Sequence, residues 1–429
     1  MPDQMIRLRT KQKQIVTAFP FYYGWVIMAA GTLGMIMTSP GQTYTEAIFI
    51  EHLLTDLSIS RSLLSTLYSF GTLVGGFSLP FWGQQTDRHG SRKMVTIVAF
   101  LFGLACIYMG FVQNAMMIGL GFIFVRMLGQ GSLGLISQTV INQWWVKKRG
   151  TIMGISGLLA ALLGTGIFPS LVYWLISAFT WRWAYIILGV GLLVIMVPVG
   201  LIFFRNRPED YGLYPDGESQ KSAADDDTTI QDITGEESWT LKEAIHTVAF
   251  WVYGLGLTMF TMLITGITFH LVSIFQNQGL EPALAAGVFL PMAIAAAGAN
   301  FLSGYLSDRI PLRYLLAAGL LFQAVSSMLT LWISTSASVL LFGIVVGIAS
   351  GIPRALSSVV WPALYGRKHL GSIYGFASSL TIIGAALGPI PFGYAYDLTG
   401  SYQPVLWTAA IITFLFAAFS LLTPEPSKG

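Results

Sequence analysis

The sequence predicts an all-α integral membrane protein with twelve transmembrane helices, arranged as two six-helix halves. Three observations lead to this prediction: the amino-acid composition, the number of long apolar segments, and a repeat that relates the halves at one constant offset. Of the 429 residues, 54% are hydrophobic and 10% are charged, whereas roughly a quarter of the residues in a soluble domain are charged. So few charges cannot cover the surface of a soluble protein of this length, and lipid is the expected environment.

Twelve segments are apolar over about 20 residues, the length at which a helix crosses a bilayer. They cover residues 22–49, 61–82, 94–112, 115–142, 151–177, 183–204, 247–275, 283–306, 314–333, 337–361, 371–396 and 402–423. None alternates apolar and polar residues as the strands of a membrane barrel do. Residues 1–204 are therefore expected to form an N-terminal half, residues 205–246 a hydrophilic cytoplasmic linker, and residues 247–429 a C-terminal half.

The distribution of positive charge predicts the orientation, because cytoplasmic segments of membrane proteins are enriched in Lys and Arg. With a cytoplasmic N-terminus, 19 of the 23 Lys and Arg residues fall on the inside. Arg61 and Arg182 fall outside, while Arg126 and Arg354 lie within spans. Both termini are thus expected in the cytoplasm of a bacterial inner membrane. No cleavable targeting segment is expected, since the first apolar segment is too long for a signal-peptide core.

One cluster of a glycine, an aspartate and two arginines occurs twice, each time after a predicted span. The two copies, whose members are all 221 positions apart, are Gly83, Asp87, Arg88, Arg92 and Gly304, Asp308, Arg309, Arg313. A parallel duplication of this kind places a binding site near the bilayer midplane, between halves that rock about it. The two glycines predict tight turns. The two Asp–Arg pairs predict a gate that holds the cytoplasmic side closed in one state.

The segment from Gly83 to Lys93, GQQTDRHGSRK, resembles the G-x-x-x-D-R-x-G-x-R-K signature of the major facilitator superfamily. Arg126, with Gln130 and Gly131, is similar to the second motif of that family. Three further segments resemble its monocarboxylate transporter and oxalate/formate antiporter branch: FYYGW at 21–25, RPEDYGLYPDG at 207–217 and DLTGSY at 397–402. The resemblance implies the major facilitator fold, alternating access and a small organic anion as substrate.

Ionisable groups are costly inside a bilayer and usually face a cavity or a partner. Arg354 lies in the tenth span on a stripe of glycine and serine, and its forked guanidinium suits a carboxylate; the alternative is a structural tether. Arg126, with Gln130 on the same stripe, is a second candidate, and the resemblance links the matching arginine to proton coupling or to helix–helix hydrogen bonds. Tyr44 and Gln42 in the first span are candidates to hydrogen-bond the substrate, with packing as their alternative.

The resembled branch carries its cationic residues in spans eight and eleven, and the corresponding spans of this chain contain none apart from the cytoplasmic Arg309. The charge that binds an anion is therefore expected from Arg354, Arg126 or both. His270, in the outer part of span seven, and Glu46, in the outer part of span one, are the candidates for proton coupling. Their alternatives are packing for His270 and contact with the outer water for Glu46.

The function predicted from these features is secondary active transport of a small, monocarboxylate-like organic anion, with or without a coupled proton. The sequence contains no nucleophile–base pair, no spaced metal ligands and no Walker motif, so neither an enzyme nor a cofactor is expected. The expected partners are a small carboxylate and membrane lipid, with no nucleic acid, and the expected state is a monomer. Two alternatives stay open: efflux or exchange of a neutral or larger amphiphilic compound, and a non-transporting receptor with the same fold.

Overall fold

The computed structural model describes residues 19–145, 148–217, 239–307, 309–365 and 370–423, and every regular element in these ranges is helical. The elements of the first bundle are α2 (Gly24–Ile36), the 3₁₀ turn η1 (Ser39–Gly41), α3 (Thr43–Leu57), α4 (Arg61–His89), α5 (Ser91–Met109), α6 (Ala115–Val125), the π-helical η2 (Arg126–Leu133), α7 (Gly134–Trp144), α8 (Arg149–Ala160), the π-helical η3 (Ala161–Ile167), α9 (Phe168–Ala178), α10 (Trp181–Gly191), the π-helical η4 (Leu192–Met196) and α11 (Val197–Ile202).

The second bundle follows a connecting segment that contains two 3₁₀ turns and one short helix. These connecting elements are η5 (Pro208–Tyr211), η6 (Pro215–Gly217) and α13 (Leu241–Ala244). The second bundle consists of α14 (Val248–Phe269), α15 (Leu271–Asn277), α16 (Pro282–Gly287), α17 (Phe289–Ser307), α18 (Leu312–Leu329), α19 (Ser336–Tyr365), α20 (Leu370–Leu387), α21 (Pro389–Thr399) and α22 (Gln403–Leu421). The all-helical membrane fold predicted from the sequence is confirmed.

Eleven helical segments of the described residues are long and apolar enough to cross a membrane. The predicted first span, 22–49, is the exception, because its helix stops at Ile36 and a second helix continues to Leu57, past the predicted end. Pro40 and Gly41 occupy the break between α2 and α3. Proline has no backbone N–H to donate, so the chain forms a 3₁₀ turn here and the backbone carbonyls around it become available to side chains.

The tight turns predicted at Gly83 and Gly304 are wrong, because both glycines lie inside helices, α4 and α17. The turn after α4 is made instead by Gly90, whose φ of +83° is a conformation that residues with a side chain rarely adopt. A Cβ at that position would lie 2.5 Å from the side-chain amide of Asn206. The motif therefore stays helical through its first glycine and turns at its second.

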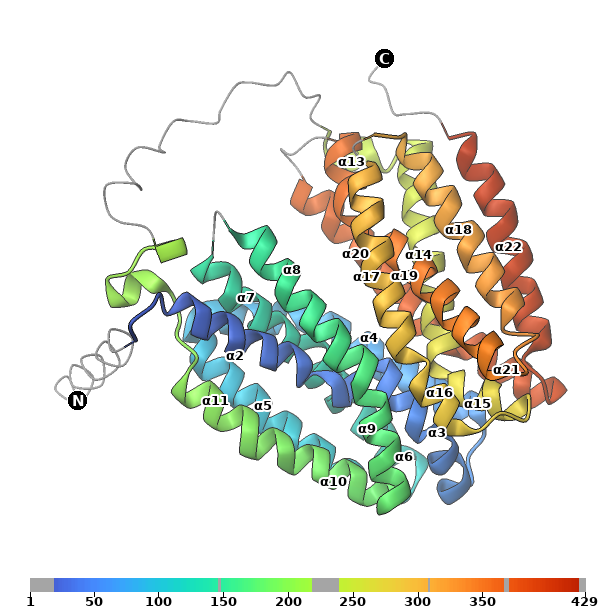
Figure 1. The fold of residues 1–429 in the computed structure, drawn as a ribbon, viewed down its shortest axis with the longest axis horizontal. Coiled ribbons are helices and arrows are strands. Elements are labelled where there is room, and N and C mark those ends of the chain that lie inside the picture. Colours follow the sequence, from blue (N-terminus) through green and yellow to red (C-terminus); the bar gives the residue numbers. More distant parts are fainter. Residues whose placement is uncertain (1–18, 146–147, 218–238, 308, 366–369, 424–429) are drawn as a thin grey trace.

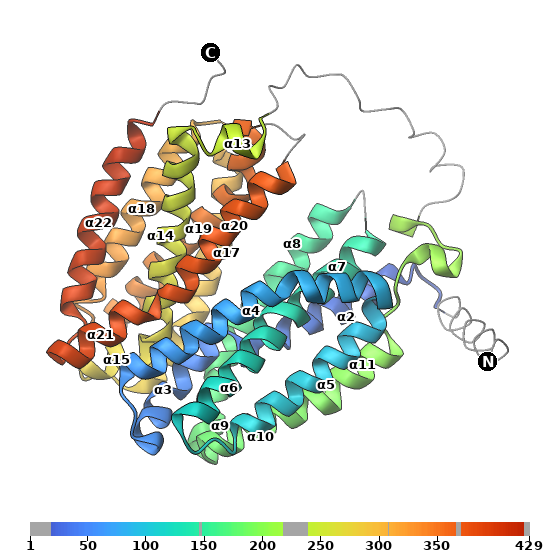
Figure 2. The same cartoon turned by 180° about the vertical axis from the view of Figure 1, so that it is seen from behind.

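The two bundles meet at one end and diverge toward the other (Figures 1 and 2). We call the end where α3, α15, α16 and α21 come together the closed end, and the end where α8, α13 and α20 begin the open end. One apolar core cluster runs through the first bundle and takes in Phe269 and Phe392 of the second. A separate cluster around Phe250 and Trp361 belongs to the open end of the second bundle alone. Buried apolar packing therefore joins the bundles at the closed end.

The segment after the sixth span packs against the open end of the first bundle. The carboxylate of Asp216 accepts a hydrogen bond from the backbone N–H of Lys148, at 2.9 Å. Trp144 donates through its indole N–H to the carbonyl of Asn206, at 2.8 Å, and Tyr22 donates to the carbonyl of Trp144, also at 2.8 Å. The RPEDYGLYPDG segment and the FYYGW segment thus meet around the fourth span and stabilise its end.

Candidate functional site

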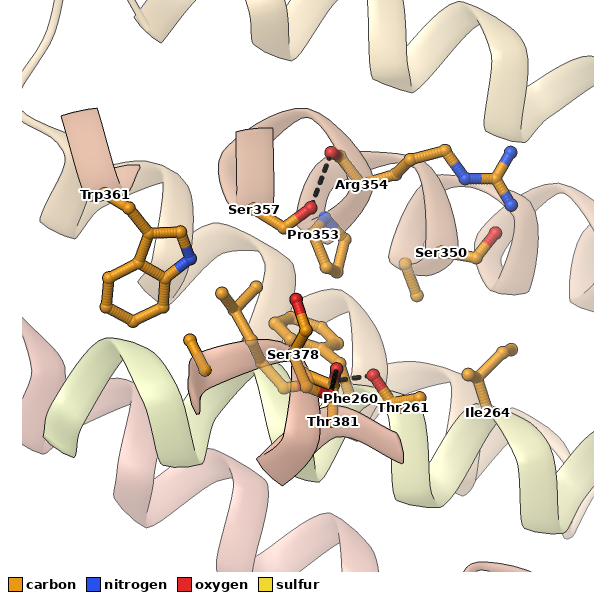
Figure 3. A pocket seen from close by; sticks show the side chains of 13 residues that line it. Phe260, Thr261, Ile264, Ser350, Pro353, Arg354, Ser357, Trp361, Ser378 and Thr381 are labelled. Atoms are coloured by element: carbon orange, nitrogen blue, oxygen red, sulfur yellow. Dashed lines mark hydrogen bonds between the residues drawn. The ribbon is translucent and has the colours of Figure 1, made fainter. Parts of the chain in front are cut away.

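A pocket of about 360 Å³ lies in the second bundle, between α14, α19 and α20. Its polar lining consists of Thr261, Ser350, Arg354, Ser357, Ser378 and Thr381. Figure 3 shows Arg354 and Ser350 on one wall, Thr261, Ser378 and Thr381 on the opposite wall, and Trp361 at one end. The pocket therefore combines one cation with several hydroxyl groups and an aromatic ring.

The guanidinium of Arg354 makes no hydrogen bond or ion pair with any residue that the structure describes, and its side chain is exposed. Ser357 donates to the backbone carbonyl of Arg354 at 2.9 Å and leaves the guanidinium free. The guanidinium extends along the wall beside Ser350, away from Trp361 (Figure 3). An unpaired guanidinium offers up to five N–H donors, so this wall can bind an acid group without breaking an existing contact.

The small residues on the Arg354 stripe do not all face this pocket. A Cβ at Gly347 would lie 2.5 Å from the carbonyl of Met292, and one at Gly343 would lie 2.8 Å from the side chain of Val288. These glycines therefore let α19 pack closely against α17 and the residue that precedes it, whereas the polar members of the stripe line the pocket. The stripe predicted from the sequence serves two faces of the helix.

A second pocket, of about 170 Å³, lies between the two bundles, where α4 and η2 face α20. Arg126, the first residue of η2, lines it and is 1% exposed. Its Nε donates to Thr72 Oγ1 at 3.0 Å and its Nη1 to the carbonyl of Gly41 at 2.8 Å. Its Nη2 has no hydrogen-bond partner among the described residues. Gln130, on the same segment, lines the pocket as well.

The break in the first span provides the carbonyl that holds Arg126. A Cβ at Gly41 would lie 2.6 Å from the carbonyl of Val125, so only a glycine lets η1 approach the start of η2 this closely. The π-helical turns that begin at Arg126 accompany this contact, and such turns often occur at functional sites. The guanidinium also lies 4.6 Å from the centre of the Tyr68 ring, at cation–π distance.

Glu46 is fully buried on α3, on the inner side of the first bundle. Its Oε2 accepts a hydrogen bond from the hydroxyl of Tyr185 at 2.5 Å, while its Oε1 has no partner among the described residues. Glu46 lies five residues after Gly41, whose carbonyl accepts from Arg126, but among the described residues its carboxyl group forms no hydrogen bond or ion pair with that guanidinium. The alternative in which Glu46 reaches the outer water is wrong for this conformation. Glu46 and Arg126, which are separate candidates in the sequence, thus lie in one buried region around the break in the first span.

Gln42 and Tyr44, predicted to contact the substrate, lie at the break of the first span. The amide of Gln42 donates to Thr38 Oγ1 at 3.1 Å, and the hydroxyl of Tyr44 is 3.0 Å from Ser39 Oγ. The ring of Tyr44 faces Phe289 of the other bundle, with centroids 6.2 Å apart. Within the part of the chain that the structure describes, both side chains lie outside the two pockets.

His270 joins α14 to α15 and is buried at the closed end. Its Nε2 lies 3.1 Å from the carbonyl of Pro389 and 3.2 Å from Ser65 Oγ of the other bundle. The hydroxyl of Tyr402 lies 3.3 Å from Nδ1. A carbonyl only accepts hydrogen bonds, so Nε2 carries a proton. The imidazole is thus a hydrogen-bonded contact between the bundles, away from Arg354.

An ion pair missed by the sequence analysis reinforces the closed end. The two terminal nitrogens of Arg61 bind the two carboxylate oxygens of Glu51, at 2.6 and 2.8 Å. Nη1 of Arg61 also donates to Ser273 Oγ of the second bundle at 2.6 Å, and Ser273 donates to Glu51. Asp397 accepts from the backbone N–H of Ser62 at 2.9 Å. We call Glu51, Arg61, Ser273 and Asp397 the closed-end latch.

The predicted gate lies at the open end, where the bundles diverge. Asp308 and the side chain of Asp87 lie outside the described residues. Arg88 is exposed near the end of α4, and the guanidinium of Arg309 lies over the ring of Tyr305, 3.7 Å from its centre. The gate assignment stays a prediction. The signal that could have located the latch was present in the sequence, because Asp397 opens the DLTGSY segment, and Glu51 and Arg61 lie 10 positions apart on the two helices that one short turn joins.

Comparison with known proteins places this architecture in context. A sequence profile of the Major Facilitator Superfamily matches residues 31–334 and 292–429. A solved structure of a bacterial homologue of the human lysosomal transporter Spinster, in an inward-facing and occupied conformation, aligns with a TM-score of 0.67. That alignment covers 95% of this chain and 98% of the other at 15% sequence identity, and it supports the fold alone.

Three relatives are similar over most of this chain. The "Probable sulfoacetate transporter SauU" of Cupriavidus necator is 22% identical over 81% of this chain and 83% of its own length. The "Cis,cis-muconate transport protein" of Acinetobacter baylyi is 21% identical over 79% and 78%. The "Probable L-galactonate transporter" of Escherichia coli is 24% identical over 86% and 83%. All three names describe transport of small organic anions.

Proposed function

The chain belongs to the major facilitator superfamily and is a multi-pass integral membrane protein, and from this premise we propose that it is a secondary active transporter of small organic anions such as a monocarboxylate. The observation that carries the proposal is the unpaired guanidinium of Arg354 in a pocket of about 360 Å³. The relatives named for sulfoacetate, muconate and galactonate support the same substrate class.

In the proposed mechanism, Arg354 binds an acid group of the substrate through its forked donors, and the hydroxyls around it bind the polar remainder. The two halves, residues 1–204 and 247–429, rock about this site in alternating access. We assign the open end and both termini to the cytoplasm of a bacterial inner membrane, because positive charge is concentrated there. The conformation described here is then open to the inside.

We propose Glu46 and His270 as the proton-coupling residues and place Glu46 first. Its carboxyl group is buried near the break that binds Arg126 and has one oxygen without a partner among the described residues. A buried carboxyl group can exchange its proton when the halves move and water reaches it. The imidazole of His270 has hydrogen bonds at both nitrogens, so its protonation requires that the closed end opens first.

The test uses purified protein in proteoliposomes and short radiolabelled carboxylates. Arg354→Gln should weaken binding about ten- to a hundredfold, because a hydrogen bond to a charged group contributes roughly 1.5–3 kcal/mol. Arg354→Lys keeps the charge but loses the fork, so it should retain part of the affinity. Lys93→Gln removes an exposed cation on α5 and is the matched control. Tight carboxylate binding by a folded Arg354→Gln protein would contradict the proposal.

A further inference from the structure

The pocket at Arg126, between the two bundles, is a defined binding pocket rather than a void left by imperfect packing. It is formed by both bundles, since Thr72 and Gly76 come from α4, Arg126 and Gln130 come from η2, and Ile382 comes from α20. A Cβ at Gly76 would lie 2.7 Å from Ile382, so α20 closes the pocket from the other side. Its volume of about 170 Å³ has room for an acid group and a few waters, each of about 30 Å³.

Arg126 is the charged group that lines this pocket, and its hydrogen-bonding capacity is not used up. Two of its three nitrogens donate to the first bundle, at Thr72 and Gly41. The third, Nη2, is buried and has no partner in the described part of the chain. Leaving a buried donor without a partner is unfavourable, and a bound acid group removes that cost. The side-chain amide of Gln130 adds further donors.

The pocket at Arg126 and the pocket at Arg354 are neighbours across one helix. Thr381 lines the Arg354 pocket and Ile382 lines the Arg126 pocket, and consecutive Cα atoms are about 3.8 Å apart. Both pockets are therefore lined by α20, and each contains one cation, Arg354 from the second bundle and Arg126 from the first. A short molecule with an acid group at each end fits this arrangement better than a molecule with one.

We propose that the Arg126 pocket is a second anion subsite, so that the preferred substrate is a short organic dianion held by Arg354 and Arg126. This inference rests on the proposed function and narrows its substrate class to anions with two acid groups. Such a ligand contacts both bundles. Its affinity therefore depends on how far they are separated, which gives it the differential affinity for two conformations that alternating access requires.

Glu46 opposes this second acid group when it is ionised, because it lies five residues after Gly41, whose carbonyl binds Arg126, and like charges repel each other. Tyr185 holds one oxygen of the Glu46 carboxyl group, Tyr68 stacks on the guanidinium, and Thr72 and Gly41 bind it. Glu46 is the acidic residue among these described neighbours. Binding of a dianion is therefore favoured when Glu46 is neutral, which ties uptake of the second acid group to uptake of a proton.

The experiment compares anions of one chain length that differ in the number of acid groups: succinate with butyrate, and adipate with hexanoate. Binding to the purified full-length protein is measured by calorimetry. We expect the dianion of at least one pair to bind ten- to a hundredfold more tightly than its partner. Arg126→Gln should remove that preference by weakening dianion binding far more than monoanion binding, whereas Arg354→Gln should weaken both. Lys93→Gln should change neither.

Two further variants test whether the loss of the dianion preference in Arg126→Gln has only a structural cause. Ala385→Leu adds bulk to the Arg126 pocket from α20 without altering Arg126, and it should abolish the dianion preference equally. Glu46→Gln removes the competing charge and should tighten dianion binding alone. Equal binding within both pairs, or equal loss of both anion types in Arg126→Gln, would overturn the second subsite. Anion binding that is absent from the wild type, or insensitive to Arg354→Gln, would instead overturn the proposed function.

Discussion

At the scale of single residues, Glu46 is the side chain that is proposed to link anion binding to proton transfer. We predict that Glu46→Gln abolishes uptake driven by an acidic outside, because the amide cannot carry the proton. Substrate counterflow needs no net proton movement, so it should persist at about the wild-type rate. Both rates are measured in proteoliposomes with and without a pH gradient. Loss of both activities together would assign Glu46 to packing or substrate binding.

His270 is predicted to respond differently from Glu46, because it lies in the contact between the bundles. His270→Ala removes the contacts to Ser65, Pro389 and Tyr402 and should slow counterflow as well as proton-driven uptake. The comparison of the two rates in the two variants separates the roles. A His270→Ala protein with intact counterflow but no proton-driven uptake would instead make His270 the coupling residue.

At the scale of elements, the latch holds α3 and α4 of the first bundle against α15 and α21 of the second. The side chains of Arg61 and Glu51 are only 13% and 22% exposed, and a bidentate, partly buried pair of this kind is among the stronger ion pairs. We predict that Arg61→Gln opens the closed end, shifting the equilibrium about ten- to a hundredfold for roughly 1.5–3 kcal/mol. Labelling of a cysteine placed at position 286, which is buried where α16 meets Ser170 of the first bundle, reports the opening.

The control for the latch is Arg182→Gln, which removes another outer arginine that pairs with Asp56 within the first bundle. That variant should leave the accessibility of position 286 unchanged. A charge exchange, Arg61→Glu with Glu51→Arg, should restore part of the closure lost in each single variant. Unchanged labelling in Arg61→Gln would mean that apolar packing alone closes this end.

At the scale of the whole molecule, closure of the closed end requires a close approach between α21 and α4. A Cβ at Gly393 would lie 2.7 Å from Ser65 Oγ and 3.0 Å from the carbonyl of Arg61. We predict that Gly393→Val holds the closed end apart, because overpacking costs about 1–3 kcal/mol, and that transport falls accordingly. Distances between spin labels on α3 and α16 measure the separation. Gly157→Val on α8, where a Cβ has open space, is the matched control.

The opposite end should depend on the repeated Asp–Arg pairs when it closes. We predict that Asp87→Asn or Asp308→Asn weakens closure of the open end, raises cysteine labelling of positions in the cavity and lowers transport, with the protein still folded in the membrane. The two substitutions should have similar effects, since the residues are related by the repeat. Transport and labelling at wild-type levels in both variants would remove these residues from the gate.

The sequence by itself determined the environment, the spans and the depth of the key charges. Hydropathy is a property of windows of about 20 residues, and the bilayer imposes that length on each helix separately. The all-helical fold and the burial of Arg126 could therefore be predicted from short windows of the sequence. The repeat at an offset of 221 residues indicated two related halves in the same way.

Only the tertiary structure decided which of these residues meet. Arg126 binds the carbonyl of Gly41, 85 positions earlier in the chain, because the first span breaks at Pro40 and a glycine lets η1 approach η2. The latch joins Arg61 to Ser273 across the two bundles. The glycines on the Arg354 stripe, Gly343 and Gly347, allow close helix packing. Such contacts depend on how helices pack and where they bend, which no local window of the sequence contains.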